Sequence, residues 1–290
     1  MNTFQNAIRN KDFVVTSECF LKPETDAEAI RIQADVLREA VDGVIVTDNQ
    51  YGRLHMSSLA AASLMLQNGV DPIMQLSCRN RNRIALLADL FGAAALGVTS
   101  LLLIRGNRVP DGMQPRPKAV FDMSAAELIA TAAAMKDDEH LLSPPEFFIG
   151  GLVTTHSPKA DWVPHKLIAK ADAGAGFMIT YPCMDTALLR GYMKHLVSNK
   201  LTHRFSVIVT TAILTSADDA RWLRDSRPNV VMPDSIVKRI ESAADPVQEG
   251  LDIGTEQIRE LREIPGIAGV NIMATTDLGQ IPNVVRAAGL

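Results

Sequence analysis

A chain of 290 residues with 47% apolar and 21% charged residues has the composition of a folded enzyme and not of a disordered protein. Its net charge of −4 gives no global electrostatic support for non-specific nucleic-acid binding. No apolar run approaches the roughly 20 residues that span a bilayer, and the polar segment 1–12 lacks a secretory apolar core, so we expect no membrane partner.

Short apolar runs alternate with longer amphipathic segments along the whole chain. The apolar runs predict eight strands, at 13–19, 43–47, 72–77, 99–104, 147–153, 176–180, 205–211 and 268–273. The amphipathic segments predict a helix after each strand, at 25–40, 56–68, 81–95, 124–136, 161–172, 184–198, 216–224 and 279–288. Two further helices, at 233–243 and 247–263, are expected before the last strand, and they offer a possible surface for a homo-oligomer.

Most of the predicted strands are continuous apolar runs, such as 100–104 and 205–209. This pattern is typical of parallel strands that are covered by helices. Since no composition shift marks a second domain, we predict a single α/β domain over residues 1–290. Its fold is a (βα)8 TIM barrel with extra helices before the last strand. Active sites of such barrels lie at the carboxyl ends of the strands.

The first predicted strand ends on Glu18, a single carboxyl group in the apolar stretch 13–20. Burial without a charge partner raises the pKa of a carboxyl group and keeps a proton ready to donate, as a general acid requires. A buried structural acid paired with Arg or Lys explains the same position equally well.

The other strand ends are polar but poor in carboxylates. They deliver Thr47, Asp48, Asn49, Gln75, Ser77, Cys78, Arg105, Gly106, Asn107, Thr154, Thr155, His156, Thr180, Tyr181, Thr210, Thr211 and Asn271. No His, Asp or Glu cluster has the spacing of metal ligands, so no metal site is expected. The cysteines Cys19, Cys78 and Cys183 are odd in number and lack a zinc or nucleophile signature, which favours packed thiols in a reducing cytoplasm.

Five segments in order along the chain carry a resemblance to a known family. They are 17–20 (Ser-Glu-Cys-Phe), 75–86 (Gln-Leu-Ser-Cys-Arg-Asn-Arg-Asn-Arg-Ile-Ala-Leu), 101–107 (Leu-Leu-Leu-Ile-Arg-Gly-Asn), 170–180 (Lys-Ala-Asp-Ala-Gly-Ala-Gly-Phe-Met-Ile-Thr) and 265–273 (Pro-Gly-Ile-Ala-Gly-Val-Asn-Ile-Met). At this spacing the chain resembles the methylenetetrahydrofolate reductase family, in its bacterial single-barrel form, over nearly its whole length.

The resemblance implies a barrel that holds FAD and uses NADH or NADPH, between which no motif chooses. It implies interconversion of 5,10-methylenetetrahydrofolate and 5-methyltetrahydrofolate by hydride transfer, after protonation of N10 opens the folate ring. Glu18 matches the family's general acid, which is the role that its burial suggests independently.

The resemblance also implies site residues. The cofactor contacts that it implies are Thr47, Gln75, Arg105, Asn107, His156 and Lys170, and the substrate contacts are Glu18, Asn107 and Tyr181. Arg105 and Lys170 suit a pyrophosphate or ribose edge. His156 lies within one residue of a family histidine, and it either binds a phosphate or flavin group or sits in a polar loop. The run 79–83 either attracts an anionic ligand tail or is a solvated helix start.

Three of these positions depart from the family: Gln75 replaces a histidine, Asn107 an aspartate and Tyr181 a glutamine. An anion near the isoalloxazine disfavours the anionic reduced flavin, so the neutral Asn107 predicts a raised flavin potential and a bias toward oxidation of 5-methyltetrahydrofolate. Drift in a tolerant loop explains Asn107 as well, and redox titration of Asn107→Asp separates the two explanations.

Two functions therefore stay open, and a third, a non-catalytic scaffold barrel, is disfavoured by Glu18 and the polar strand ends. The first is a flavin-dependent folate oxidoreductase. The alternative is a reductase-like barrel that binds folate without FAD, and that transfers hydride directly from a nicotinamide or serves as a partner of a methyltransferase.

Overall fold

The computed structural model describes residues 3–109, 112, 114–159 and 161–290, and in it eight parallel strands close into a barrel. The strands are β1 (Val14–Glu18), β2 (Gly43–Val46), β3 (Pro72–Ser77), β4 (Ser100–Ile104), β5 (Phe148–Val153), β6 (Phe177–Thr180), β7 (Ser206–Ile213) and β8 (Ile267–Ala274). Each pairs with the next in the chain, and β8 pairs with β1 to close the ring. The predicted (βα)8 barrel is confirmed.

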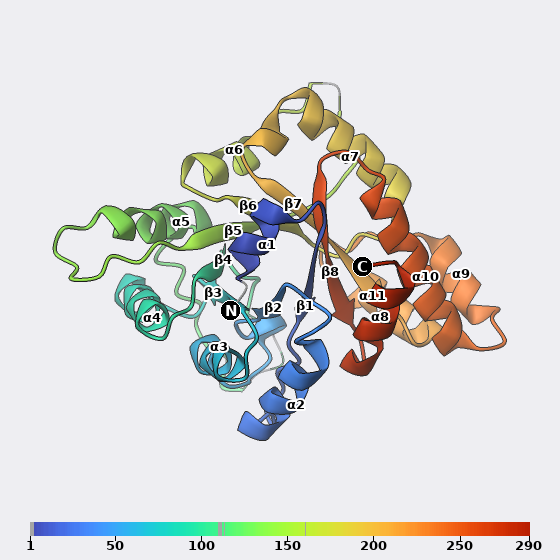
Figure 1. The fold of residues 1–290 in the computed structure, drawn as a ribbon, viewed down its shortest axis with the longest axis horizontal. Helices are drawn as coiled ribbons and strands as arrows, with labels where there is room; N and C mark the ends of the chain where they lie inside the picture. The colour runs from blue at the N-terminus through green and yellow to red at the C-terminus, as the bar shows by residue number, and fades with distance from the viewer. Residues whose placement is uncertain (1–2, 110–111, 113, 160) are drawn as a thin grey trace.

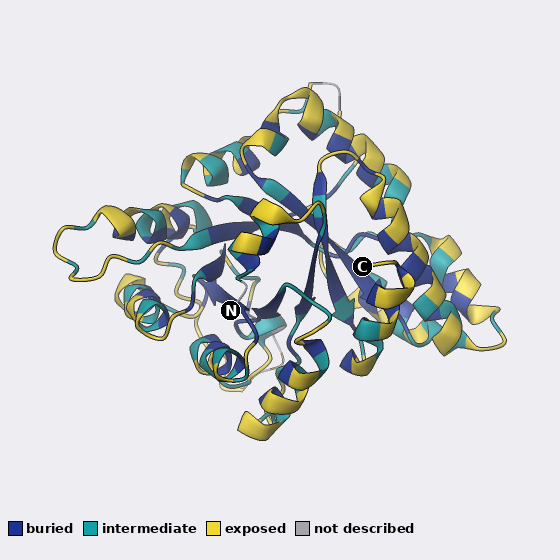
Figure 2. Ribbon diagram, viewed as in Figure 1, coloured by how far each residue is buried: buried dark blue, intermediate teal, exposed yellow. Residues whose placement is uncertain are grey.

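Helices surround the barrel (Figure 1) and turn exposed faces outward (Figure 2). They are α2 (Ala27–Leu37), α3 (Ser58–Gln67), α4 (Arg83–Ala95), α5 (Ala125–Ala134), α6 (His165–Asp172), α7 (Thr186–Ser198), α8 (Ala217–Ser226), α9 (Asp234–Glu241), α10 (Pro246–Arg262) and α11 (Ile281–Ala287), with short 3-10 turns η1 (Gln50–Gly52), η2 (Met135–Asp137), η3 (Leu201–His203) and η4 (Leu278–Gln280). Side-chain caps such as Asp26, Ser57 and Asn82, each accepting from the backbone N–H three residues on, show why many of these helices start where they do.

Several helix boundaries differ from the prediction by a few residues, and proline accounts for two of the differences. The helix expected over 161–172 begins only at His165, because Pro164 keeps the preceding residue out of the helical conformation. The helix expected over 279–288 is divided into η4 and α11, with Pro282 in the first turn of α11.

The two extra helices before the last strand, α9 and α10, are present as predicted. Helix α10 packs against β7 and β8, and its buried residues include Ile253, Ile258 and Leu261. The apolar side of the segment that offered an oligomer surface therefore lies inside the subunit.

Helix α1 (Phe4–Asn10) has no counterpart among the predicted elements, because only Phe4 and Ala7 of its seven residues are buried. Phe4 enters the barrel, with its ring centroid 5.7 Å from that of Phe148 and 5.2 Å from that of Phe177. Its backbone N–H donates to Asp71, just before β3, at 2.7 Å. Figure 1 shows α1 lying across the middle of the ring of strands. The helix thus closes the barrel at the end where the strands begin. The end that stays open to a ligand is the opposite one, at the carboxyl ends of the strands.

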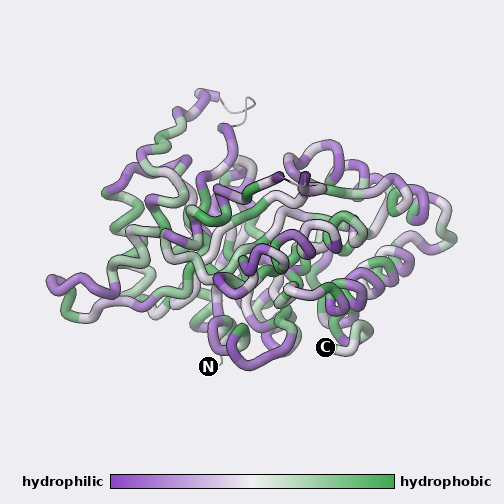
Figure 3. The backbone as a smooth tube through the Cα atoms, turned by 90° about the horizontal axis from the view of Figure 1, so that it is seen from above, coloured by the Kyte–Doolittle hydropathy of each residue, from purple (hydrophilic) through white to green (hydrophobic). Residues whose placement is uncertain are grey.

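The barrel interior is apolar near this closed end. Its side chains include Val14, Ile45, Ile73, Leu102, Phe177 and Ile208. A second apolar layer joins the outer faces of the strands to the helices. Figure 3 shows hydrophilic residues prominent on the outer loops and turns.

Among the described residues, no helix combines the length and the apolar character that a bilayer crossing demands.

Candidate active site

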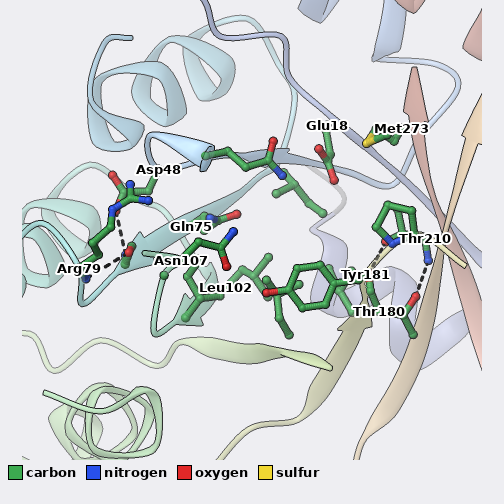
Figure 4. A pocket seen from close by; sticks show the side chains of 18 residues that line it. Glu18, Asp48, Gln75, Arg79, Leu102, Asn107, Thr180, Tyr181, Thr210 and Met273 are labelled. Carbon is green, nitrogen blue, oxygen red and sulfur yellow. Dashed lines mark hydrogen bonds between the residues drawn. The ribbon is translucent and has the colours of Figure 1, made fainter. Parts of the chain in front are cut away.

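A pocket of about 640 Å³, including the space at its mouth, opens at the carboxyl ends of the strands. Apolar side chains line part of it, among them Ile45, Leu102, Ile104, Leu152 and Ile179. Polar side chains from several strand ends complete it: Glu18, Asp48, Gln50, Gln75, Ser77, Arg79, Asn107, Thr180, Tyr181 and Thr210 (Figure 4). Apolar walls combined with polar groups that can orient a ligand are typical of pockets for small organic molecules and cofactors. We call this cavity the central pocket.

Glu18, the last residue of β1, brings a carboxyl group to the central pocket. The side-chain amide of Asn271 on β8 donates to its Oε1 at 3.2 Å. Burial raises the pKa of Glu18, while the Asn271 hydrogen bond and the charge of Arg227 lower it, and burial prevails. The direction expected from the sequence holds, but the charge partner, Arg227, was not foreseen.

Asn271 also ties Glu18 to a buried polar layer inside the barrel. Its Oδ1 accepts from the Thr16 hydroxyl at 3.0 Å, and its Nδ2 also donates to Thr210 Oγ1 at 3.2 Å. Thr210 in turn donates to the carbonyl of Thr180 at 2.7 Å. Because these partners fix the direction of the Asn271 amide, they also fix the side from which Glu18 receives its hydrogen bond.

A second pocket, of about 1150 Å³, adjoins the first. Glu18, Gln50 and Met273 line both. The second pocket is basic: its lining includes Lys22, Arg53, His55 and Arg227, together with the indole of Trp222. The Cζ atom of Arg227 lies 4.2 Å from the Trp222 ring centroid and that of Arg53 lies 5.8 Å from it. We call this cavity the basic pocket, because its charge suits an anionic group.

Asp48, just after β2, is buried in the wall of the central pocket. Its Oδ2 accepts from the Ser77 backbone N–H at 2.8 Å and from Arg81 at 2.6 Å, and Arg81 also pairs with Asp89. Arg79 is buried beside it and donates to the carbonyl of Asn49 at 2.7 Å. Within the run 79–83, Arg79 lines the central pocket and Arg81 pairs with Asp48 and Asp89, whereas Arg83 is exposed at the start of α4.

The loop after β4 depends on Gly106. This residue has φ of +84°, and a Cβ atom on it would lie 2.1 Å from Ser77 Oγ. The close approach lets Asn107 line the central pocket. Arg105, by contrast, is exposed, and its guanidinium stacks at 4.1 Å on the ring of Phe121.

A third pocket, of about 900 Å³, lies at the end of β5 and shares Leu152 with the central pocket. His156, Trp162, His165, Lys166, Lys170 and Tyr192 are among its lining residues. His156 lies in the polar loop after β5 and packs edge-on to Trp162, with ring centroids 4.5 Å apart. Lys170 donates to the Leu152 carbonyl, and burial lowers its pKa. We call this cavity the β5 pocket.

The residues expected to bind cofactor and substrate are thus divided among the three pockets. Glu18, Gln75, Asn107 and Tyr181 share the central pocket, Thr47 lines the basic pocket, and His156 and Lys170 line the β5 pocket. Arg105 does not line any of these three. Asn271 and Asp48 were among the residues expected at the strand ends, but no role was predicted for them. No feature of the sequence pointed to Arg227.

Of the three thiols, Cys19 lines the basic pocket, whereas Cys78 and Cys183 line none of the three pockets. Cys19, Cys78 and Cys183 are buried. Burial raises the pKa of Cys78 to about 11 and also raises that of Cys183, which leaves neither with the thiolate character of a nucleophile. In the part of the chain that the structure describes, no group of three His, Cys, Asp or Glu side chains gathers as metal ligands do.

A comparison with protein families matches residues 3–288 to the family described as methylenetetrahydrofolate reductase. The chain belongs to this family. A search of curated sequences returned no significant match.

Two solved structures share the barrel fold of this chain. One is an uncharacterized protein from Clostridium thermocellum that binds two copies of 5-methyl-5,6,7,8-tetrahydrofolic acid; it has a TM-score of 0.67 at 10% identity and covers 98% of this chain and 97% of its own. Another is DmoA from Hyphomicrobium sulfonivorans, with a TM-score of 0.57 at 10% identity over 94% of this chain and 86% of its own. At this identity the likeness concerns the fold alone.

Proposed function

We propose that this protein is a flavin-dependent oxidoreductase that interconverts 5,10-methylenetetrahydrofolate and 5-methyltetrahydrofolate, with NADH or NADPH as the second substrate. The observation that carries the proposal is the position of Glu18 at the border between the central pocket and the basic pocket. Family membership and the folate bound by the Clostridium thermocellum protein support it.

A reduced folate matches this pair of cavities. Its pterin ring is flat and suits the central pocket, whereas its glutamate tail is anionic and suits Lys22, Arg53 and Arg227 of the basic pocket. The one-carbon unit bridges N5 of the pterin and N10 at the start of the tail. A folate that occupies both cavities therefore brings its reactive atoms to their border, where Glu18 stands.

Glu18 supplies the proton chemistry. Because its pKa is raised, the carboxyl group holds its proton to higher pH than an exposed glutamic acid does. It donates this proton to N10, the bond between N10 and the bridging carbon breaks, and the carbon is left as an electrophilic iminium on N5. In the oxidising direction Glu18 takes the proton back. Asn271 orients the carboxyl group throughout.

The chain also offers groups that fit FAD. Gln75 and Asn107 place side-chain amides in the central pocket, where the ring edge of a flavin needs both donors and acceptors. The β5 pocket, which meets the central pocket at Leu152, combines Lys166 and Lys170 with the aromatic Trp162, and so suits a pyrophosphate and an adenine. When bound, the flavin supplies the hydride.

Asn107 lines the central pocket, so the redox hypothesis attached to it stays a prediction. Asp48 adds a buried carboxyl group to the same pocket. We expect Asn107→Asp to lower the flavin potential, and redox titration of the two proteins measures the difference.

A second candidate is folate binding without FAD, either with direct hydride transfer from a nicotinamide or as a partner of a methyltransferase. This candidate is favoured by two cationic side chains that already have partners within the protein. Lys170 is bonded to the Leu152 carbonyl and Arg105 is stacked on Phe121, although both match flavin-contacting positions of the family.

One experiment separates the two candidates. The absorbance spectrum of the purified protein is recorded before and after anaerobic addition of 5-methyltetrahydrofolate. We expect a flavin band that bleaches on addition. A colourless protein that stays inactive with added FAD but binds 5-methyltetrahydrofolate contradicts the first candidate and supports the second.

A further inference from the structure

Helix α4 is apolar on the side that faces away from the barrel as well as on the side that packs against it. Its buried residues are Leu86, Leu90 and Ala93. The exposed apolar residues that recur three or four positions apart on the opposite side are Ile84, Ala88, Phe91 and Ala95. Ile84 is 78% exposed and Phe91 is 45% exposed. A helix that is apolar all round is typical of a protein interior, so this stripe needs a cover that one chain does not provide.

The stripe carries no charge. Helix α4 contains two charged residues, Arg83 and Asp89, and neither belongs to the stripe. Asp89 pairs with Arg81 at 2.6 Å. Arg83 precedes Ile84, and successive residues of a helix point about 100° apart. Helix α3, which contacts α4, has no charged residue. This surface therefore has the composition of the core of an interface, where charged residues are depleted.

Helices α3 and α5 flank α4 on one side of the barrel (Figure 1). Gly92 lets α3 and α4 pack closely, because a Cβ atom on it would lie 3.0 Å from Leu59 of α3. We call the outward surface of these three helices the α4 face. Since α4 has 13 residues and its neighbours lie about 10 Å away on each side, the face measures about 20 Å by about 30 Å. Two such faces bury about 1,200 Å² together, which exceeds the roughly 1,000 Å² of a specific interface.

We propose that the α4 face is the contact between two copies of this chain, which form a symmetric dimer with their α4 helices antiparallel. The inference is independent of the folate function proposed above. It also moves the oligomer surface away from α9 and α10, whose apolar residues are used inside the subunit.

The order of residues along the stripe fits a second copy of itself. In a twofold antiparallel pair, the first residue of the stripe meets the last, and the two middle residues meet each other. Ile84 then lies opposite Ala95 of the second copy, and Phe91 lies opposite Ala88. Each large side chain thus meets a small one, which lets facing helices interdigitate. The positive amino end of each α4 also meets the negative carboxyl end of the other.

The opposite side of the barrel is a solvated face. There Arg239 of α9 pairs with Glu249 and Glu256 of α10 (Figure 1). A lipid surface is also a poorer match for the α4 face than a second copy is. Helices that lie on membranes carry many lysine and arginine residues beside the apolar stripe, whereas α4 carries Arg83 at one end.

The first test measures the mass of the protein by analytical ultracentrifugation up to about 50 µM, above the micromolar Kd of weak interfaces. We expect the unaltered protein to sediment as a dimer. Phe91→Glu places a charge in the contact twice, so the Kd of dimerisation should rise about hundredfold or more. Val247→Glu is the matched control and should keep the Kd, because Val247 on α10 is 44% exposed but lies outside the α4 face.

The second test locates the contact without adding a charge. Ala88→Cys puts a thiol next to the twofold axis, where two copies come within reach of a disulfide. The native cysteines are buried and do not compete. Thiols held together in a dimer have an effective concentration of about 1 mM, so under mild oxidation Ala88→Cys should form a covalent dimer at least about tenfold faster than Val247→Cys.

Three results overturn the inference. They are an unaltered protein that stays monomeric, an unchanged Kd in a folded Phe91→Glu variant, and cross-linking of Ala88→Cys no faster than that of Val247→Cys. The last of these decides even where Phe91→Glu does not fold. A monomer that cosediments with phosphatidylcholine vesicles, and loses this binding in Phe91→Glu, assigns the α4 face to a lipid surface instead.

Discussion

Glu18 and Asp71 are buried carboxyl groups at opposite ends of one barrel. Glu18 ends β1 at the open mouth, whereas Asp71 precedes β3 at the end that α1 closes. Burial raises the pKa of both, that of Asp71 to about 6. Asp71 accepts the backbone N–H of Phe4 at 2.7 Å, while Glu18 receives one longer bond, of 3.2 Å, from Asn271.

The two groups differ in what they can reach. Asp71 faces the helix that plugs the barrel, and its hydrogen bond serves to hold that plug. Glu18 lines two cavities, and among the described residues one side-chain donor, Asn271, holds it. A raised pKa therefore reports burial at both ends, and it indicates catalysis only where a cavity brings a substrate to the group.

Glu18→Gln should have the largest effect on activity. The amide cannot supply the proton for N10, so we expect the folate half-reaction to slow by about 10²- to 10⁴-fold. The exchange between nicotinamide and flavin needs no such proton and should continue. Stopped-flow measurement of the two half-reactions checks both statements. Equal loss in both would make Glu18 a structural acid like Asp71.

Phe4→Ala tests the closed end. Phe4 is fully buried against Phe148 and Phe177, and its truncation leaves a cavity beneath the barrel. We expect the free energy of unfolding to fall by about 3–5 kcal/mol, as measured by urea denaturation. The affinity for 5-methyltetrahydrofolate should not change, because the site lies at the other end. A stability loss under 1 kcal/mol would show that α1 is not the plug described here.

The strands could be predicted from the sequence, whereas the plug could not. Parallel strands covered by helices are apolar throughout, so all eight stood out as runs. Helix α1 buries two residues in seven, which is too few to mark an amphipathic helix. Its role depends on Phe148 and Phe177, which the fold brings to it from far along the chain.

The candidate site could be predicted only in part. Glu18 stands out in the sequence because a lone carboxyl group in an apolar run is unusual, and Asn271 has the same signature as a lone amide in β8. Its bond to Glu18, however, joins residues 253 positions apart and exists only because β8 closes on β1. Arg227 acts from a loop beyond α8, where an arginine attracts no notice. The residues expected to bind the cofactor are divided between the central pocket and the β5 pocket, which meet at Leu152. This division likewise depends on the folded barrel.

Asp71→Asn tests the carboxyl group at the closed end. The native pKa of about 6 lies above the ordinary 3.8, so the native state binds more protons than the unfolded state between these values. The free energy of unfolding of the unaltered protein should therefore fall as pH rises from 4 to beyond 6, by at most about 3 kcal/mol from this group. Asp71→Asn keeps an acceptor for Phe4 and loses this dependence. Urea denaturation at pH 4.5 and 7.5 measures the difference, and parallel pH profiles would contradict it.

Arg227→Gln is the finest test of the open end. The positive charge of Arg227 lowers the pKa of Glu18 against the effect of burial, so its removal should raise that pKa further. A general acid works while it is protonated, and the pH at which folate reduction declines should then move to higher values. Arg53→Gln is the matched control, because Arg53 contacts the same Trp222 but does not act on the pKa of Glu18. A shift to lower pH, or an equal shift in both variants, would mean that the basic pocket does not tune the acid.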